Sequence, residues 1–335
     1  MNPYTPPAFE PARGLPLIAT EPVGVCAVCN AEDFVLQADG FDFELETCRN
    51  HWQFWRCTRC DHIQLDPRPT SETLQTIYPP HYYSYAMQKK ISAIALAGKA
   101  MLDRWKFRNF LAFLGRKPNS YLDIGCGDLK YLDVMRGQGI APCNLYGLEL
   151  DAAVVERARA CGYSVFQERA ETAASIPADA IDVVTMFHVI EHVADPGAVL
   201  RSVARWLTPD GILVIETPNT AAQDARLFRR RYWGGYHIPR HWHLFTPEGL
   251  ARLLSQTGFQ PVATHYQTGH SFWLYSFHHL LRYNSVLPMP RLARLFDPLH
   301  SLFLLAGATA WDKLRALLGW KTSAMLVIAR RTPPA

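Results

Sequence analysis

The sequence predicts an α/β protein with a doubly wound, mostly parallel sheet, preceded by a small cysteine-rich module. Two observations favour the sheet. From residue 120 onward, short apolar runs alternate with helical stretches, and a glycine turn follows the first run. The third observation is a pair of Cys-x-x-Cys motifs near the start of the chain, which marks the module as a separate part.

Composition excludes several classes of protein. The 335 residues are 49% hydrophobic and 19% charged, which is typical of a folded chain with a substantial core. A net charge of +4, from 34 basic and 30 acidic residues, disfavours a nucleic-acid partner held mainly by charge. The longest near-apolar run, residues 302–311, is shorter than the ~20 residues of a membrane span. No signal-peptide pattern is present, so we expect a cytoplasmic protein.

Changes of composition and proline- or glycine-containing stretches divide the chain into four predicted parts. Residues 1–22 form a proline-rich irregular arm, 23–70 the cysteine module, and 71–118 a helical linker or lid. Residues 119–335 form the main domain, with a helical insertion at about 271–321. Three tyrosines in the linker, Tyr82, Tyr83 and Tyr85, suit either a lid or linker packing.

The main domain is predicted to contain seven strands. We expect them at residues 121–124, 145–148, 163–166, 181–187, 211–215, 259–266 and 324–329. Helices at about 152–161 and 197–207 follow the second and fourth strands. Strands that alternate with helices predict a parallel sheet covered on both faces.

A glycine turn and a carboxylate mark a candidate cofactor site. Gly125 and Gly127 follow the first strand, where glycine lets the backbone approach a ligand closely. Glu149 stands 22 residues after Gly127 at the end of the second strand, where it can accept hydrogen bonds from ribose hydroxyls.

Four motifs resemble those of class I S-adenosylmethionine-dependent methyltransferases. They are Leu122-Asp-Ile-Gly-Cys-Gly127, Tyr146-Gly-Leu-Glu149, Asp182-Val-Val-Thr-Met-Phe-His-Val-Ile-Glu-His-Val193 and Leu207-Thr-Pro-Asp-Gly-Ile-Leu-Val-Ile-Glu-Thr-Pro-Asn219. The resemblance covers about residues 120–328. It implies a Rossmann-like seven-stranded sheet whose one antiparallel strand is 324–329, with S-adenosylmethionine as cofactor. NAD is disfavoured, because Lys130 stands where dinucleotide-binding turns carry a third glycine.

The resemblance also implies roles for individual residues. Asp123, Gly125 and Gly127 would line the methionine part of the cofactor, and Glu149 would hold the ribose. Residues near the adenine would be Arg169, Ala170 and Glu171, and those beside the sulfonium and sugar would be Phe187 and His188. Leu129 stands where the family often has a third glycine.

Two histidine clusters are candidates for catalysis. Methyl transfer needs an aligned nucleophile, and a hydroxyl acceptor gains roughly 10²–10⁴-fold from a general base. His188, Glu191 and His192 follow the fourth strand and are candidate bases; holding a divalent cation or fixing the loop are alternatives. Residues 232–245 contain His241 and Arg240 and suit an acceptor pocket in which Arg240 holds a carboxylate or phosphate. A packed aromatic loop is the alternative.

The cysteine pairs predict a structural zinc site. Cys26 and Cys29 are separated by 27 residues from Cys57 and Cys60, and two such pairs can complete a closed tetrahedral site. A redox dithiol and an iron–sulfur cluster are the alternatives. The segment also resembles zinc-ribbon modules fused ahead of methyltransferases, including those acting on sugars and secondary metabolites.

The insertion at 271–321 combines apolar and basic residues. A leucine and alanine stripe runs through Leu292, Leu295, Leu299, Leu302, Ala306 and Ala310. Six basic residues stand against two acids. This composition fits weak peripheral contact with a membrane or a lid over a lipidic acceptor, but it does not favour either over simple packing. Packing on the core, or on a second subunit in a homodimer, is the alternative.

Together these features predict methyl transfer from S-adenosylmethionine to a small or lipid-linked metabolite, such as a sugar, quinone or polyketide-like acceptor. An RNA methyltransferase is one alternative. It is disfavoured by the near-neutral charge and by Phe187-His188, which replaces the Asn/Asp-Pro-Pro-aromatic motif of base-methylating enzymes. A non-catalytic binding module on the same fold is the other.

Overall fold

The structure, a computed structural model, describes residues 14–79, 93–284, 286–298 and 301–332. The chain forms two compact units. The sheet unit comprises Pro80–Glu216, Ala251–Thr264 and Val327–Ala335, and the cysteine unit comprises Met1–Pro79, Thr217–Leu250 and His265–Leu326. Most of the predicted arm and the tyrosines Tyr82, Tyr83 and Tyr85 lie outside the described residues.

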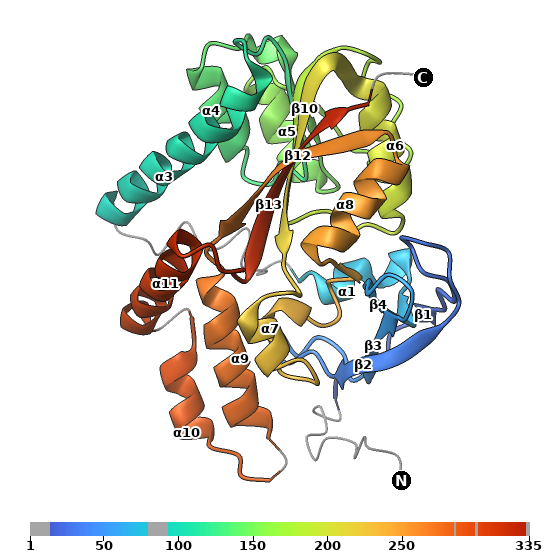
Figure 1. The fold of residues 1–335 in the computed structure, drawn as a ribbon, viewed down its shortest axis with the longest axis vertical. Coiled ribbons are helices and arrows are strands. Elements are labelled where there is room, and N and C mark those ends of the chain that lie inside the picture. The colour runs from blue at the N-terminus through green and yellow to red at the C-terminus, as the bar shows by residue number, and fades with distance from the viewer. Residues whose placement is uncertain (1–13, 80–92, 285, 299–300, 333–335) are drawn as a thin grey trace. The chain divides into compact units, whose positions relative to one another are not determined.

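A seven-stranded sheet has the strand order β12-β13-β10-β9-β6-β7-β8 (Figure 1). Its strands are β6 (Tyr121–Ile124), β7 (Leu145–Leu148), β8 (Ser164–Phe166), β9 (Ile181–Phe187), β10 (Leu207–Pro218), β12 (Phe259–Gln267) and β13 (Ala324–Arg331). The pairings from β10 through β9, β6 and β7 to β8 are parallel, and β13 runs against β10 (Figure 1). The predicted mixed seven-stranded sheet is therefore confirmed.

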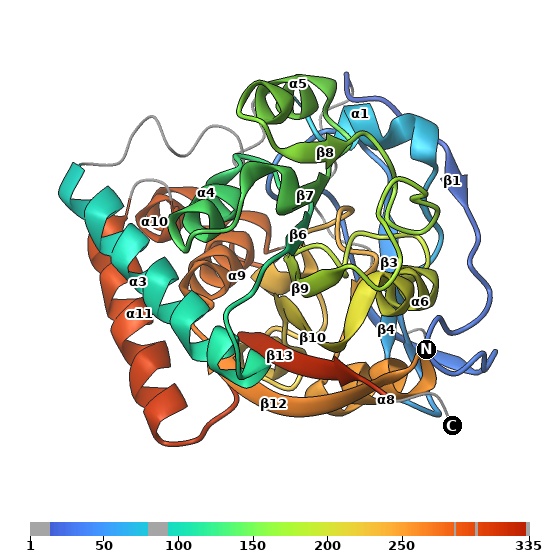
Figure 2. The same ribbon diagram turned by 90° about the horizontal axis from the view of Figure 1, so that it is seen from above.

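Helices cover both faces of the sheet, with α3 and α4 on one face and α6 and α8 on the other (Figure 2). The helices are α3 (Ala93–Leu111), η3 (Ala112–Leu114), α4 (Lys130–Gly137), η4 (Pro142–Asn144), α5 (Ala152–Ala160), α6 (Pro196–Trp206) and α8 (Pro247–Gln256). Aspartate caps begin two of them. Asp151 accepts a hydrogen bond from the Ala153 N–H at 2.8 Å, and Asp195 accepts one from the Ala198 N–H at 2.8 Å.

The core of the sheet unit lies in the central strands. Val183, Val184 and Met186 of β9 and Ile212 and Val214 of β10 have no exposed surface. Consecutive residues point to opposite faces of a strand, so both faces of these strands are covered. This double covering explains why the sequence shows continuous apolar runs there and no alternation.

A second sheet organises the cysteine unit, with the order β11-β4-β3-β2. Its strands are β2 (Phe34–Gly40), β3 (Trp52–Cys57), β4 (Ile63–Leu65) and β11 (His243–Leu244), and β1 (Thr20–Glu21) pairs separately with β5 (Arg68–Pro69). β11 pairs antiparallel with β4, His243 opposite Gln64. A strand from late in the chain thus completes the sheet of the cysteine module. The short helices η1 (Ser71–Thr73) and α1 (Leu74–Ile77) follow it.

The insertion folds as several short helices. Within it lie α9 (His270–Tyr283), α10 (Pro290–Ala293), η6 (Arg294–Phe296) and α11 (Leu302–Leu317). The cysteine unit also contains α7 (Gln223–Leu227) and η5 (Gly234–Tyr236), which precede the insertion. The apolar stripe predicted from Leu292 to Ala310 is therefore divided between helical pieces, and Leu299 lies outside the described residues. Asp297 is extended, with φ −70° and ψ 115°, because the proline that follows disfavours a helical conformation.

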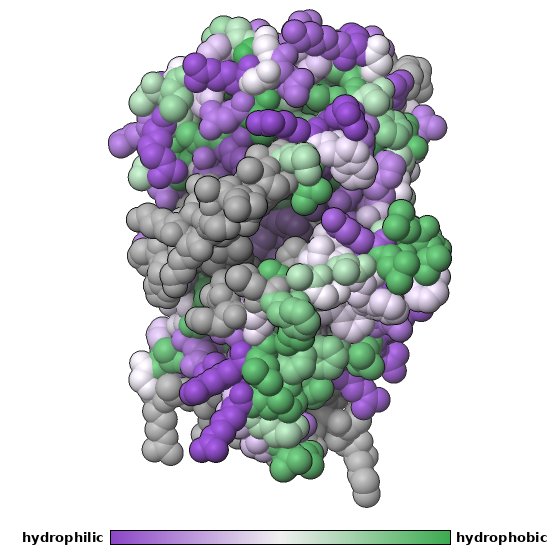
Figure 3. Space-filling model, turned by 90° about the vertical axis from the view of Figure 1, so that its left-hand side faces the viewer, coloured by the Kyte–Doolittle hydropathy of each residue, from purple (hydrophilic) through white to green (hydrophobic). Residues whose placement is uncertain are grey.

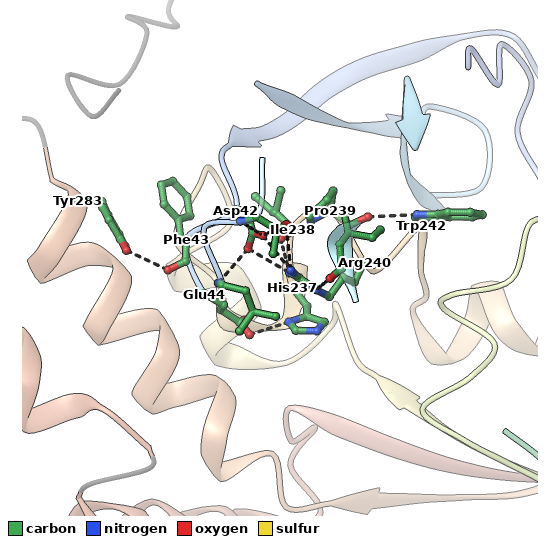
Figure 4. Close-up of polar contacts among 12 residues, drawn as sticks. Asp42, Phe43, Glu44, His237, Ile238, Pro239, Arg240, Trp242 and Tyr283 are labelled. Carbon is green, nitrogen blue, oxygen red and sulfur yellow. Dashed lines mark hydrogen bonds and ion pairs between the residues drawn. The ribbon is translucent and has the colours of Figure 1, made fainter. Parts of the chain in front are cut away.

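Three ion pairs join the cysteine module to the segment 231–240, and Figure 4 shows the two that involve Asp42 and Glu44. They are Asp39–Arg231 at 2.7 Å, Asp42–Arg240 at 2.8 Å and Glu44–His237 at 2.7 Å. Arg240 has no exposed surface, and its Nε also donates to the Ile77 carbonyl at 2.7 Å. Burial alone would raise the pKa of Asp42, but the Arg240 guanidinium holds that pKa below its ordinary value.

Arg240 therefore does not act as predicted. The sequence placed it in an acceptor pocket, where it would hold a carboxylate or phosphate. In the structure both terminal nitrogens of its guanidinium donate to the Asp42 carboxylate, at 3.0 and 2.8 Å. A buried arginine needs a permanent partner to offset its loss of hydration, and a residue of the chain supplies it.

We expect Asp42→Asn to lower the free energy of unfolding by about 3–5 kcal/mol, because it leaves the Arg240 charge buried without a counter-ion. The matched control is Asp61→Asn, since Asp61 pairs with Arg56 at the surface. That change should cost less than about 1 kcal/mol. Urea unfolding measures both values, and equal effects of the two substitutions would contradict a structural role for the buried pair.

Candidate functional site

The turn between β6 and α4 exposes backbone at the end of a strand. Gly125 and Gly127 have positive φ angles of 74° and 43°. A Cβ added at Gly125 would lie 2.8 Å from a methyl of Val189, so no larger residue fits there. Leu129 also adopts a left-handed conformation, with φ 65°, at the position where the family often has glycine. That conformation costs a leucine about 1–2 kcal/mol.

Glu149 ties the second strand to this turn. Its Oε2 accepts a hydrogen bond from the Gly127 N–H at 2.9 Å, and its Oε1 accepts one from the Leu150 N–H at 2.7 Å. The side chain is partly exposed. The carboxylate is therefore fixed beside the glycine turn and still has acceptor capacity for a ligand.

Asp123 is buried at the end of β6. Its Oδ1 accepts a hydrogen bond from the Thr185 hydroxyl at 2.7 Å, and that hydroxyl is 2.6 Å from the Tyr121 hydroxyl. Burial raises the pKa of Asp123 to about 7, although the Thr185 hydrogen bond opposes the shift. Asp123 is thus a carboxyl group that changes its charge near neutral pH.

His188 lies between two carboxylates at the end of β9. Its Nδ1 is 3.1 Å from Glu191 Oε1, and its Nε2 is 3.8 Å from Glu216 Oε1. Its backbone is left-handed, with φ 55°, and its N–H donates to the Glu216 carbonyl at 2.8 Å. Desolvation would lower the His188 pKa, but the hydrogen bond to Glu191 and the two negative charges raise it above the ordinary value.

Lys106 and Glu216 complete this cluster, and the sequence analysis missed both. Lys106 Nζ is 2.9 Å from Glu216 Oε2 and lies 3.9 Å from the centre of the Phe187 ring and 5.0 Å from that of Tyr131. Burial would lower the Lys106 pKa, but the Glu216 charge raises it. Glu216 follows the apolar run of the fifth strand, which was a usable signal, whereas nothing distinguishes Lys106 from other basic residues of its helix.

The predicted adenine-side residues lie between β8 and β9. Ala170 is buried, and Glu171 accepts a hydrogen bond from the Ala194 N–H at 2.9 Å. Arg169 is 3.5 Å from the same Glu171 oxygen. His192 closes the turn after β9 through its backbone, because its N–H donates to the Val189 carbonyl at 2.9 Å.

His241, predicted as a further candidate for catalysis, belongs to the cysteine unit. Its side chain is buried, and its Nδ1 lies 2.8 Å from the Gly235 carbonyl oxygen, which can only accept. Its ring is 5.0 Å from that of His237. Nδ1 therefore carries the proton, and the imidazole orientation is set by the loop around it.

The four paired cysteines form one cluster. The sulfur atoms of Cys26, Cys29, Cys57 and Cys60 all lie within 4.8 Å of one another. Cys26 Sγ is 3.4 Å from Cys60 Sγ, and Cys29 Sγ is 3.6 Å from Cys57 Sγ. Zinc–sulfur bonds of about 2.3 Å in a tetrahedron place the sulfurs about 3.8 Å apart. The donor set and its spacing therefore fit a zinc ion.

The two halves of the cluster have the same backbone geometry. The residue after each second cysteine is left-handed, with φ 56° at Asn30 and 59° at Asp61. The Asn30 N–H donates to the Cys26 carbonyl at 2.9 Å, and the Asp61 N–H donates to the Cys57 carbonyl at 3.0 Å. Each Cys-x-x-Cys pair thus closes the same tight turn, which aims both sulfurs at a common centre.

Comparisons with known proteins agree with the geometry of the sheet unit. A family model described as a methyltransferase domain matches residues 96–264, which is 169 of 335 residues. The ubiquinone biosynthesis O-methyltransferase of Thiobacillus denitrificans is 30% identical over 153 residues, covering 42% of this chain and 63% of that protein. The enzyme of the same name from Dinoroseobacter shibae is 28% identical over 162 residues, covering 44% and 64%.

Both alignments cover slightly less than two thirds of the relatives' own length. Among solved structures, a SAM dependent methyltransferase from Archaeoglobus fulgidus is similar with a TM-score of 0.45 and 19% identity, covering 69% of this chain and 94% of that one. Because the family model spans half of the chain and the strand-end motifs lie within it, the chain belongs to the methyltransferase domain family.

Proposed function

We propose that the protein transfers the methyl group of S-adenosylmethionine to a hydroxyl of a small or lipid-linked metabolite. The observation that carries this proposal is His188, held between Glu191 and Glu216 at the end of β9. The relatives are named for ubiquinone biosynthesis, which favours a quinone-type acceptor over a sugar or a polyketide. The proposed setting is the cytoplasm, with reversible contact at the inner face of the membrane.

The cofactor is proposed to lie along the carboxyl ends of β6 and β7. Asp123 would pair with its amino group, the backbone of Gly125 and Gly127 would approach its methionine part, and Glu149 would accept from the ribose hydroxyls. The adenine would lie near the residues Arg169, Ala170 and Glu171. S-adenosylmethionine supplies the electrophilic methyl group, and the chain aligns the acceptor with it.

His188 is proposed as the general base. Its Nδ1 faces Glu191, which sets the tautomer that leaves Nε2 free to take a proton from the acceptor. Glu216 stabilises the resulting imidazolium, and Lys106 keeps Glu216 ionised, since its charge lowers the Glu216 pKa. His192 and His241 are the alternative bases.

Calorimetry with S-adenosylmethionine tests the donor site. Only ionised Asp123 can pair with a positively charged amino group, and its pKa is about 7. We therefore expect roughly fivefold to tenfold weaker binding at pH 6 than at pH 7.5. Asp123→Asn should weaken binding at pH 7.5 and remove this pH dependence, whereas the exposed control Glu156→Gln should behave as the wild type.

Affinity that does not change with pH in the wild type would contradict the role of Asp123. Binding of NAD in place of S-adenosylmethionine would contradict the proposed function as a whole. A protein that binds the donor but forms no S-adenosylhomocysteine with small-molecule or lipid fractions would be the non-catalytic binding module. Product formation with RNA alone would support the RNA methyltransferase.

Titration of His188 tests the proposed base. Glu191→Gln removes a negative charge that stabilises the imidazolium, so the His188 pKa should fall from its raised value toward or below 6.5. NMR follows the imidazole signals, and the signal lost in His188→Gln assigns the resonance among the 13 histidines. Glu156→Gln, which is remote on α5, should leave the pKa unchanged. A pKa that stays or rises in Glu191→Gln would contradict the assignment.

The four clustered cysteines are proposed to hold one structural zinc ion. All four positions of a tetrahedral ion would be filled by thiolates, so no site remains for a substrate. Zinc binding of order 10 kcal/mol would couple directly to the folding of the sheet around them.

Elemental analysis of the purified protein should find one zinc ion per chain. Cys57→Ser should lose the metal and lower the melting temperature, because three thiolates leave the site open. Cys161→Ser is the matched control, since Cys161 is an exposed thiol outside the cluster, and it should keep the zinc. Absence of zinc from the wild type, or iron with sulfide in its place, would contradict the proposal.

A further inference from the structure

Helix α11 buries an acidic and a basic side chain and exposes large apolar ones. Asp312 has no exposed surface and Arg315 has 1%. Asp312 accepts hydrogen bonds from the Gly269 N–H at 2.9 Å and from Trp273 Nε1 at 3.2 Å, and it pairs with Arg315 at 3.0 Å. Asp312 thus attaches the helix to α9 and its N-cap through hydrogen bonds, while Arg315 neutralises the Asp312 charge from within α11.

The outer face of α11 consists of large apolar side chains. Their exposed fractions are 88% at Phe303, 45% at Trp311, 49% at Leu314, 85% at Leu317 and 58% at Leu318. At 100° per residue these five positions fall within one arc of about 120°. Figure 3 shows hydrophobic side chains gathered over the α9–α11 segment. An apolar face of this kind on a surface helix indicates an interaction site.

The charge around this face is positive. Arg291, Arg294 and Lys313 are exposed, and no salt bridge joins them to any residue that the structure describes. Between residues 286 and 321 the sequence contains only two acids, Asp297 and Asp312. Asp312 is buried and already paired with Arg315. The segment therefore combines the exposed apolar face of α11 with exposed cations on α10, η6 and α11, and this charge is complementary to an anionic surface.

We infer that the outer face of α11, with the basic residues of α10 and η6, docks on an anionic lipid bilayer. Apolar side chains would enter the interfacial region while the cations meet lipid phosphates. Trp311 and the half-exposed Trp320 suit that boundary, because indole has an apolar ring and a polar N–H. A second copy of the chain is disfavoured, because a two-fold contact would bring cations against cations.

None of the described helices combines the length and apolar composition that crossing a membrane requires. Docking would therefore be peripheral and reversible. The inference deepens the proposed membrane setting, but it does not depend on methyl transfer, because lipid binding is measured without donor or acceptor.

Vesicle sedimentation with the full-length protein tests the surface. We expect binding to phosphatidylcholine vesicles that contain phosphatidylglycerol at low salt, and weaker binding to phosphatidylcholine alone or at high salt. The double variant Phe303→Glu with Leu317→Glu should lose at least tenfold in binding. Both side chains are more than four fifths exposed, so the fold should tolerate the change. The matched control is Leu227→Glu, on the 65% exposed leucine of α7, and it should bind as the wild type does.

A second variant tests the charges. Arg291→Gln with Arg294→Gln should weaken binding at low salt and reduce its salt dependence, because two cations are removed. The inference is overturned if the wild type does not bind anionic vesicles at low salt, or if the glutamate variants bind as well as the Leu227→Glu control. It is also overturned if ultracentrifugation shows a dimer that the glutamate variants dissociate while vesicle binding is absent.

Discussion

The parallel pairing of β6, β9 and β10 is the constraint on which the candidate site depends. Ile124 lies opposite Met186, and Glu216 lies opposite Phe187. Because parallel strands point the same way, the residues that follow them emerge at one edge of the sheet. The glycine turn, the Glu149 carboxylate and the His188 cluster meet there. A shift of one strand by one residue would turn His188 or Glu216 toward the opposite face.

Both units contain a basic side chain held beside carboxylates, but the two basic side chains differ in their exposure to solvent. Arg240 has no exposed surface and both terminal nitrogens are bound to Asp42, so it stabilises the loop and cannot release a ligand or a proton. His188 also lies beside carboxylates, but its side chain is 44% exposed. Exposure allows His188 to exchange protons with solvent, which the buried Arg240 cannot do, and this difference supports the proposed role of His188 as a base.

Local sequence patterns predicted much of the fold but did not determine which side of helix α11 is buried. A leucine stripe is normally the buried side of a helix, and in α11 the buried side is instead the Asp312–Arg315 pair. The two residues are three positions apart, so they share one helix face. Once that face is anchored to α9, the apolar residues remain outside, which no count of leucines distinguishes from a buried stripe.

The sequence by itself determined the strands, the glycine turn and the cysteine cluster, because each rests on residues close together in the chain or on a spacing that only one geometry satisfies. Tertiary structure decided which charges meet. Lys106 reaches Glu216 across 110 positions, and Arg240 reaches Asp42 across 198. Such contacts leave no local pattern, since any acid in the chain is an equal candidate partner until packing brings one within hydrogen-bond distance and excludes water from the pair.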